Sequence, residues 1–146
     1  MKYDDASWHY GGDFPNDLPN EAGATHIGMF LAWALLAGLG GEIFADELAE
    51  EVGRLRIRAI TPGAFFFSVC DGKFIDEDLN ELGNAFALDY YESESADFIP
   101  DYDATLAVGL PSTYHVPDSW ESYDKLKPVI DNRFAQWQSS RPVNSH

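Results

Sequence analysis

The sequence predicts a mainly α-helical fold, in a single domain of about five helices with at most one short β element. Apolar residues recur at three- and four-residue steps in several segments, which is the spacing of the buried side of a helix. The 146 residues make one domain of ordinary size, and no linker or internal repeat divides them. A content of 45% hydrophobic and 14% aromatic residues is enough to build a core.

Residues 1–24 are expected to form an irregular but ordered arm. Gly, Pro, Asn and Asp residues interrupt any helical spacing there. The arm also carries Tyr3, Trp8, Tyr10 and Phe14, which are too many aromatic residues for a free tail. We therefore expect it to lie on the core.

The first helix is predicted to begin at His26. Thr25 can cap it, because a threonine side chain accepts a hydrogen bond from a free backbone N–H group. Apolar residues surround this helix on nearly all sides, so it should be the central, buried helix. Gly38, Gly40 and Gly41 are predicted to end it.

A second helix is predicted over about residues 45–55. Its inner stripe consists of Phe44, Leu48, Val52 and Leu55. Residues 54–60 then alternate charged and apolar side chains, which fits either a short strand or the end of this helix. The choice between strand and helix is open for residues 105–114 as well.

Two more helix starts are predicted in the middle of the chain. Thr61 and Pro62 indicate the first, because proline at the first helical position has no N–H group to leave unbonded. Asp71 and Gly72 end that segment with a turn. Asp76 opens the next helix, where acidic residues near the N-terminus are favourable. Its inner residues are Leu79, Leu82, Phe86 and Tyr90.

The last predicted helix begins at Asp118, which can form a capping box with Glu121. Pro128 falls inside the apolar pattern and predicts a kink or two abutting helices. The helical core is therefore expected to span residues 25–137, and residues 138–146 to form a frayed tail.

The charge of the chain restricts its partners. It has 25 Asp and Glu against 9 Lys and Arg, a net charge of −16. Such a protein is a poor candidate for binding nucleic acid or anionic membranes, which need clustered basic residues, but it suits a basic protein. Arg54, Arg56 and Arg58 form the one basic patch, expected either to balance nearby glutamates or to hold a partner's carboxylate or phosphate.

Residues 71–103 are the main functional signal, because eleven acids and one base lie there with aromatic residues between them. Residues 91–103 are expected to be irregular. Aromatic anchors among charges are typical of a protein interface, and a solvated acidic face is the alternative. The residues predicted to bind a partner are Asp89, Tyr91, Glu92, Glu94, Asp97, Asp101 and Tyr102.

Signals for catalysis and metal binding are weak. His9, His26 and His115 could meet carboxylates in space, but they have no metal-ligand spacing. Ser122 and Lys125 spell a Ser-x-x-Lys motif without its companion motifs. We therefore expect no catalytic residue, no metal and no cofactor. The alternative is a small hydrolase or metal-dependent enzyme that uses these histidines.

The N-terminus has no feature of a secretory signal, and the longest nearly uncharged apolar run, residues 27–39, is shorter than the roughly 20 residues of a membrane span. The single Cys70 excludes an intramolecular disulfide and is expected to be a buried thiol. These features predict a cytoplasmic protein.

Residues 1–15, which read MKYDDASWHYGGDFP, and residues 22–33, which read AGATHIGMFLAW, carry a resemblance. They resemble a family of small, acidic, cytoplasmic bacterial proteins associated with genes beside secreted polymorphic toxins. The resemblance implies an immunity protein, a non-catalytic partner that blocks the active site of a cognate toxin. A nuclease with a basic groove is the expected toxin, and an adaptor or scaffold is a further alternative. The oligomeric state is open.

Overall fold

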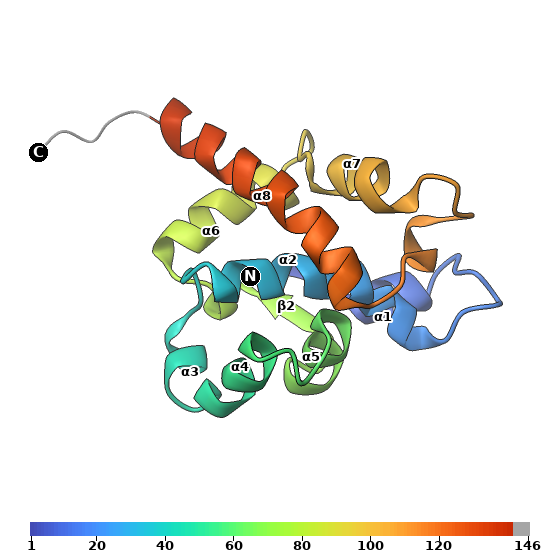
Figure 1. The fold of residues 1–146 in the computed structure, drawn as a ribbon, viewed down its shortest axis with the longest axis horizontal. Coiled ribbons are helices and arrows are strands. Elements are labelled where there is room, and N and C mark those ends of the chain that lie inside the picture. Colours follow the sequence, from blue (N-terminus) through green and yellow to red (C-terminus); the bar gives the residue numbers. More distant parts are fainter. Residues whose placement is uncertain (142–146) are drawn as a thin grey trace, which may run out of the picture.

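Helix α2 (Thr25–Leu36) lies at the centre of the protein, and other helices are arranged around it (Figure 1). The structure is a computed structural model that describes residues 1–141. Every residue of α2 except Leu36 is buried, which confirms the prediction of a central buried helix. Thr25 is not its cap: the 3-10 turn η1 (Asn20–Ala24) leads directly into α2, so Thr25 already lies in the first helical turn.

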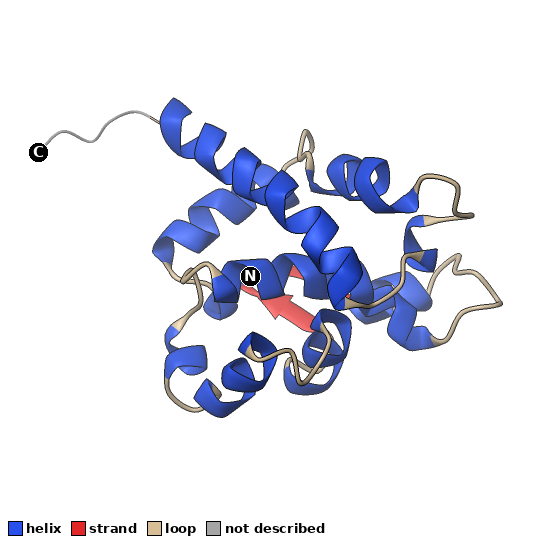
Figure 2. Ribbon diagram, in the orientation of Figure 1, coloured by secondary structure: helices blue, strands red, loops and turns tan. Residues whose placement is uncertain are grey.

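The described residues contain eight α-helices and one two-stranded sheet (Figure 2), which confirms the mainly helical class. The other helices are α1 (Ala6–Tyr10), α3 (Glu42–Ala45), α4 (Ala49–Arg56), α5 (Pro62–Val69), α6 (Glu81–Ala87), α7 (Phe98–Tyr102) and α8 (Trp120–Ser140). Short 3-10 or π-helical turns are η2 (Asp76–Asp78), η3 (Leu88–Glu92), η4 (Asp103–Ala107) and η5 (Thr113–His115). The structure has more than the five helices predicted, because the short helices α1 and α7 form in residues 1–24 and 91–103, which were expected to be irregular.

A short antiparallel sheet joins the N-terminus to the middle of the chain. Strand β1 (Lys2–Asp5) pairs with β2 (Lys73–Ile75), and the rings of Tyr3 and Phe74 pack with centroids 4.9 Å apart. The arm at residues 1–24 is ordered, as predicted, but it is not irregular, because it consists largely of β1, α1 and η1.

Neither segment considered for a β element is a strand. Residues 54–56 complete α4, and residues 105–107 belong to η4. Within residues 54–60 only Leu55 is fully buried. The alternation of charged and apolar side chains there therefore does not mark the covered face of a strand.

Two predicted helices are shorter than expected. Residues 45–55 are divided between α3 and α4. The helix predicted from Asp76 begins at Glu81, because the Asn80 side chain caps it by accepting a hydrogen bond from the Gly83 N–H at 2.8 Å.

Helix α8 is continuous through Pro128, so the prediction of two abutting helices is wrong. Ser119 caps it, accepting a hydrogen bond from the Ser122 N–H at 3.1 Å. Residues 138–140 are helical rather than frayed, Arg141 follows as the C-cap of α8, and residues 142–146 of the predicted tail lie outside the described residues. None of the helices within residues 1–141, α8 included, is both long and apolar enough to cross a membrane.

Helices α2 and α5 touch backbone to backbone at Gly28. A Cβ atom on Gly28 would lie 2.4 Å from the carbonyl oxygen of Pro62. The helix start predicted at Pro62 is confirmed, and only glycine at position 28 lets that start approach α2 so closely.

Asp118 caps α5, not α8. Its carboxylate accepts hydrogen bonds from the Thr61 hydroxyl at 2.6 Å and from the N–H groups of Gly63 and Ala64 at 2.7 and 3.1 Å. A carboxylate at a helix N-terminus satisfies free N–H groups and opposes the positive end of the helix dipole. Asp118 therefore ties the segment before α8 to the start of α5.

We expect Asp118→Ala to lower the free energy of unfolding by about 2 kcal/mol, because it removes hydrogen bonds to a charged acceptor and leaves N–H groups unpaired. Urea unfolding measures the change. Asp124→Ala is the control, since the exposed ion pair of Asp124 with Arg58 should contribute at most about 1 kcal/mol. Equal losses in the two variants would contradict the capping role.

Candidate functional site

The two tyrosines predicted to bind a partner both pack against the core, but to different depths. Tyr102 is fully buried, and Tyr91 is partly buried with its hydroxyl donating to Asp4 Oδ2 at 2.6 Å. Tyr102 shares one face of α7 with Phe98, which precedes it by four residues and is also buried. Tyr102 therefore has no exposed surface to offer a partner, whereas Tyr91 packs against the core, is only partly buried, and stays a predicted contact.

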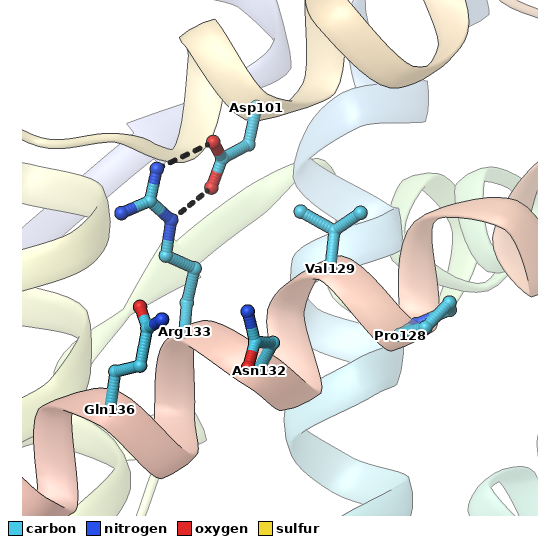
Figure 3. Close-up of a pocket in the computed structure, with 6 residues that line it drawn as sticks. All are labelled: Asp101, Pro128, Val129, Asn132, Arg133 and Gln136. Atoms are coloured by element: carbon cyan, nitrogen blue, oxygen red, sulfur yellow. Dashed lines mark hydrogen bonds and ion pairs between the residues drawn. The ribbon is translucent and has the colours of Figure 1, made fainter.

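Asp101 is engaged within the protein. Arg133 of α8 donates two hydrogen bonds to its carboxylate, at 2.9 and 3.0 Å, and the Tyr90 hydroxyl donates a third at 2.7 Å. Figure 3 shows the Arg133 side chain extending from α8 to Asp101, with Asn132 and Gln136 beside it. A basic partner at Asp101 would have to compete with Arg133.

The other four predicted residues, Asp89, Glu92, Glu94 and Asp97, are exposed. Asp89 accepts a hydrogen bond from Trp137 Nε1 at 2.7 Å, and Asp97 lies 3.4 Å from Arg133. Within residues 1–141, Glu92 and Glu94 form no ion pair. The predicted surface thus keeps an acidic edge but not Tyr102 as an aromatic anchor.

A second acidic surface lies between the start of α3 and the turn that leads into α6, at the left of Figure 1. It is a groove of about 680 Å³. The acidic groove is defined here by Glu42, Ile43, Glu77, Asp78, Leu79 and Glu81. In the described part of the chain, no Lys or Arg lines it.

Backbone hydrogen bonds hold the two walls of the acidic groove together. The Gly41 N–H donates to the carbonyl of Asp78 at 2.9 Å, and the Asn80 N–H donates to the carbonyl of Leu39 at 2.8 Å. A Cβ atom on Gly41 would lie 2.2 Å from the carbonyl oxygen of Glu77, so this contact needs glycine. The groove is therefore a fixed feature of the fold.

The acids of the groove differ in exposure. Glu42, Glu77 and Glu81 are exposed, whereas Asp78 is buried and accepts a hydrogen bond from the Ile75 N–H at 2.9 Å. Burial, together with the neighbouring acids Glu77 and Asp76, raises the pKa of Asp78 to about 6, although the hydrogen bond from Ile75 opposes the shift. Sequence reasoning missed this site because its walls meet only in the folded chain.

A polar cluster lies where β1, α1 and α2 meet, and consists of Asp4, His9, His26, Tyr91 and Tyr114. His9 Nε2 lies 2.8 Å from Asp4 Oδ1, and His26 Nε2 lies 3.9 Å from Asp4 Oδ2. One ligand atom from each of Asp4, His9 and His26 falls within 4.8 Å of the others, so these three side chains could hold a metal ion. The sequence predicted no metal site.

Burial determines the protonation of the cluster. Burial, together with the neighbouring His9, lowers the pKa of the fully enclosed His26 to about 3. Burial opposes ionisation of Asp4, but hydrogen bonds from His9 and Tyr91 hold the pKa of Asp4 below its usual value. At neutral pH, His26 is therefore neutral and Asp4 ionised.

The third candidate histidine, His115, does not join this cluster. Its Nε2 lies 2.9 Å from Asp17 Oδ2, and its Nδ1 lies 2.8 Å from the Ser112 hydroxyl. Two of the three candidate histidines thus converge with a carboxylate, which is the arrangement that the enzyme alternative requires.

A family model described as a domain of unknown function, DUF7832, matches residues 2–116, which is most of the chain. The chain belongs to the DUF7832 family. No curated protein and no solved structure matches it. The part matched to DUF7832 contains every residue of the acidic groove and of the polar cluster.

The Ser-x-x-Lys motif lies beyond the DUF7832 match, in α8. Ser122 is buried and hydrogen-bonds to the Ser119 hydroxyl at 3.1 Å, whereas Lys125 is exposed and lies 3.6 Å from Glu121. Lys125 is therefore not arranged as a base for Ser122.

The structure also explains the surroundings of Arg58 and Cys70, two residues considered in the sequence analysis. Arg58 of the basic patch pairs with Asp124 of α8 at 2.7 Å and lies over the Trp120 ring, so it is not balanced by the glutamates of α4. Burial raises the pKa of the Cys70 thiol, which makes it a poor nucleophile.

Proposed function

We propose that this DUF7832 protein is a non-catalytic protein that binds a basic protein partner, as an immunity protein binds and inhibits a toxin. The partner it fits is a cognate bacterial toxin with a basic surface, of the nuclease type. The observation that carries the proposal is the acidic groove, where four carboxyl groups surround apolar side chains and no Lys or Arg lines the walls within residues 1–141.

The groove combines the two properties of a protein-binding surface. Ile43 is 40% exposed beside the carboxylates, so a partner can bury apolar area there. The carboxylates would attract and orient basic side chains, and the net charge of −16 would raise the rate of encounter. Apolar contact then slows dissociation.

The acidic edge at residues 89–97 is the weaker candidate. Its carboxylates Asp89 and Asp97 already contact Trp137 and Arg133. A partner would have to displace these contacts, whereas the exposed Glu42, Glu77 and Glu81 of the groove form no ion pair within the described residues.

Charge reversal tests the proposal with two matched variants. One replaces Glu42, Glu77 and Glu81 by Lys, and the other replaces Glu92, Glu94 and Asp97 by Lys, so both change the net charge equally. The binding assay uses the proposed cognate nuclease toxin, sought among the products of the neighbouring genes, together with survival of cells that express it. We expect the groove variant to bind at least about 100-fold more weakly and to give no protection, because each close charge pair contributes several-fold or more.

The matched pair separates the possible results. Loss of binding only in the second variant would move the interface to the acidic edge. Retention in both variants, or no complex with the unaltered protein, would contradict the proposed function. The association rate should also fall as salt rises, because screening weakens the attraction of exposed charges.

A further inference from the structure

We propose that Asp4, His9 and His26 form a binding site for one divalent transition-metal ion of the zinc or ferrous-iron class. This goes beyond the binding of a basic partner, since the site is a separate cluster made by β1, α1 and α2. Its ligand atoms already lie within 4.8 Å of one another.

The present distances are close to those of a bound ion. Zinc binds nitrogen and carboxylate oxygen at about 2.0–2.2 Å, so two of its ligand atoms are at most about 4 Å apart. Asp4 Oδ1 and His9 Nε2 are 2.8 Å apart, and Asp4 Oδ2 and His26 Nε2 are 3.9 Å apart. An ion would replace the hydrogen bond between His9 Nε2 and Asp4 Oδ1, and the His9 proton would then lie on Nδ1, which faces the Tyr114 hydroxyl.

An independent observation points to a missing ligand. His26 is 2% exposed, its Nδ1 has no hydrogen-bond partner, and its Nε2 is beyond hydrogen-bond distance of Asp4. The hydroxyl of Tyr102, whose ring centroid lies 6.2 Å from that of His26, is also buried without a partner. Buried polar atoms normally have partners, and an ion bound at Nε2, the nitrogen that faces Asp4, would give the enclosed His26 ring the partner that Asp4 does not provide.

Neighbouring tyrosines hold the ligands in the way that metal sites require. The Tyr91 hydroxyl donates to Asp4 Oδ2 at 2.6 Å, and His9 Nδ1 lies 2.8 Å from the Tyr114 hydroxyl. A hydrogen bond to the second nitrogen of a metal-bound histidine fixes its orientation. The site thus has both its ligands and their supports.

The donor set determines the class of ion. Two imidazoles and one carboxylate suit zinc or ferrous iron, whereas magnesium and calcium prefer oxygen ligands alone. Three protein ligands leave at least one position for water. The His9 side chain is 23% exposed, so the site is open to solvent on that side.

Metal content of the full chain, purified without a histidine tag, tests the proposal. Metal-stripped protein is dialysed separately against Zn²⁺, against Fe²⁺ without oxygen, and against Mg²⁺. We expect one equivalent of Zn²⁺ or Fe²⁺ and none of Mg²⁺, and the two transition-metal arms identify which ion binds more tightly. Co²⁺ should show the absorption of a site with nitrogen ligands.

Variants locate the ion. His9→Gln and Asp4→Asn should abolish the bound equivalent, and Tyr114→Phe should weaken binding by about 10- to 100-fold. His115→Gln is the matched control, because His115 pairs with Asp17 at 2.9 Å much as His9 pairs with Asp4, yet no third ligand group meets them in residues 1–141. It should leave binding unchanged.

Two results would overturn the proposal. One is the absence of stoichiometric Zn²⁺ or Fe²⁺ in the unaltered protein. The other is full retention of the ion in His9→Gln, whose circular dichroism reports whether it is folded. Because His9 is partly exposed, this variant decides the question even if Asp4→Asn fails to fold. Neither result depends on whether a toxin partner is bound.

Discussion

Phe30→Ala is expected to lower the free energy of unfolding by about 3–5 kcal/mol, the usual cost of removing a buried phenylalanine side chain. Phe30 is 1% exposed and lies at the middle of an aromatic cluster. The rings within 6.2 Å of its centroid belong to Trp33, Phe74, Phe86, Tyr90, Tyr91 and Phe98. They come from several elements, so the cavity left by the mutation could close only by moving β2, α6 and α7 together.

Urea unfolding measures this loss from the midpoint and slope of the transition. Phe30→Leu should cost less than about 1.5 kcal/mol, since a large apolar side chain still fills the space. Val108→Ala, at a side chain that is 78% exposed, should change stability by less than about 0.5 kcal/mol. If Phe30→Ala resembled Val108→Ala, the aromatic cluster would not be the stabilising core.

The elements that the sequence predicts well are those determined by neighbouring residues. Helix α2 is apolar on all sides, and Pro62 begins α5, so both are recognisable without knowledge of the fold. The turn at Asp71 and Gly72 is also correct, and both residues have the positive φ angles typical of a type I′ turn. The mainly helical class follows from such local patterns.

Contacts between distant residues explain the errors in the fold. Strand β1 exists because it meets β2, about seventy residues later, and neither segment is long enough to show a strand pattern. Asp118 was expected to cap the helix beside it, yet its carboxylate bonds to the N-terminus of α5. A capping pattern identifies a suitable side chain but not which helix it reaches.

The candidate sites were predicted unevenly for the same reason. Exposed acids such as Glu92 and Glu94 were correctly placed on the surface, because charge itself favours solvent. Tyr102 was misplaced, since in a helix as short as α7 the sequence does not show which side faces the core. Asp4, His9 and His26 lie on three different elements, so their meeting leaves no spacing pattern.

Asp78→Asn is expected to stabilise the free protein near neutral pH by as much as about 3 kcal/mol, the free energy of about two pKa units. Burial raises the pKa of Asp78 to about 6 from its ordinary value of 3.8. The folded state therefore binds a proton more tightly than the unfolded state. This tighter proton binding contributes to the free energy of unfolding. The contribution is complete below the pKa of Asp78 in the unfolded chain and is lost as the pH rises through about 6.

Asparagine removes the charge and keeps an acceptor for the Ile75 N–H group, which Asp78 now bonds at 2.9 Å. Urea unfolding should therefore show a large gain at about pH 7.5 and little gain at about pH 4. Glu77→Gln is the matched control, because it removes the same charge from an exposed neighbour and should give a small gain. Equal gains at both pH values, or equal gains in both variants, would contradict the effect of burial.

The same substitution links stability to the proposed docking. A basic partner in the acidic groove would favour the ionised form of Asp78, so binding and ionisation should assist each other. Asp78→Asn should then make the free protein more stable while weakening the complex, and the weakening should disappear at a pH where Asp78 is already protonated. A groove that served only solubility would show the gain in stability without any change in binding. The buried carboxylate thus lowers the stability of the free chain in a way that a basic partner would reverse.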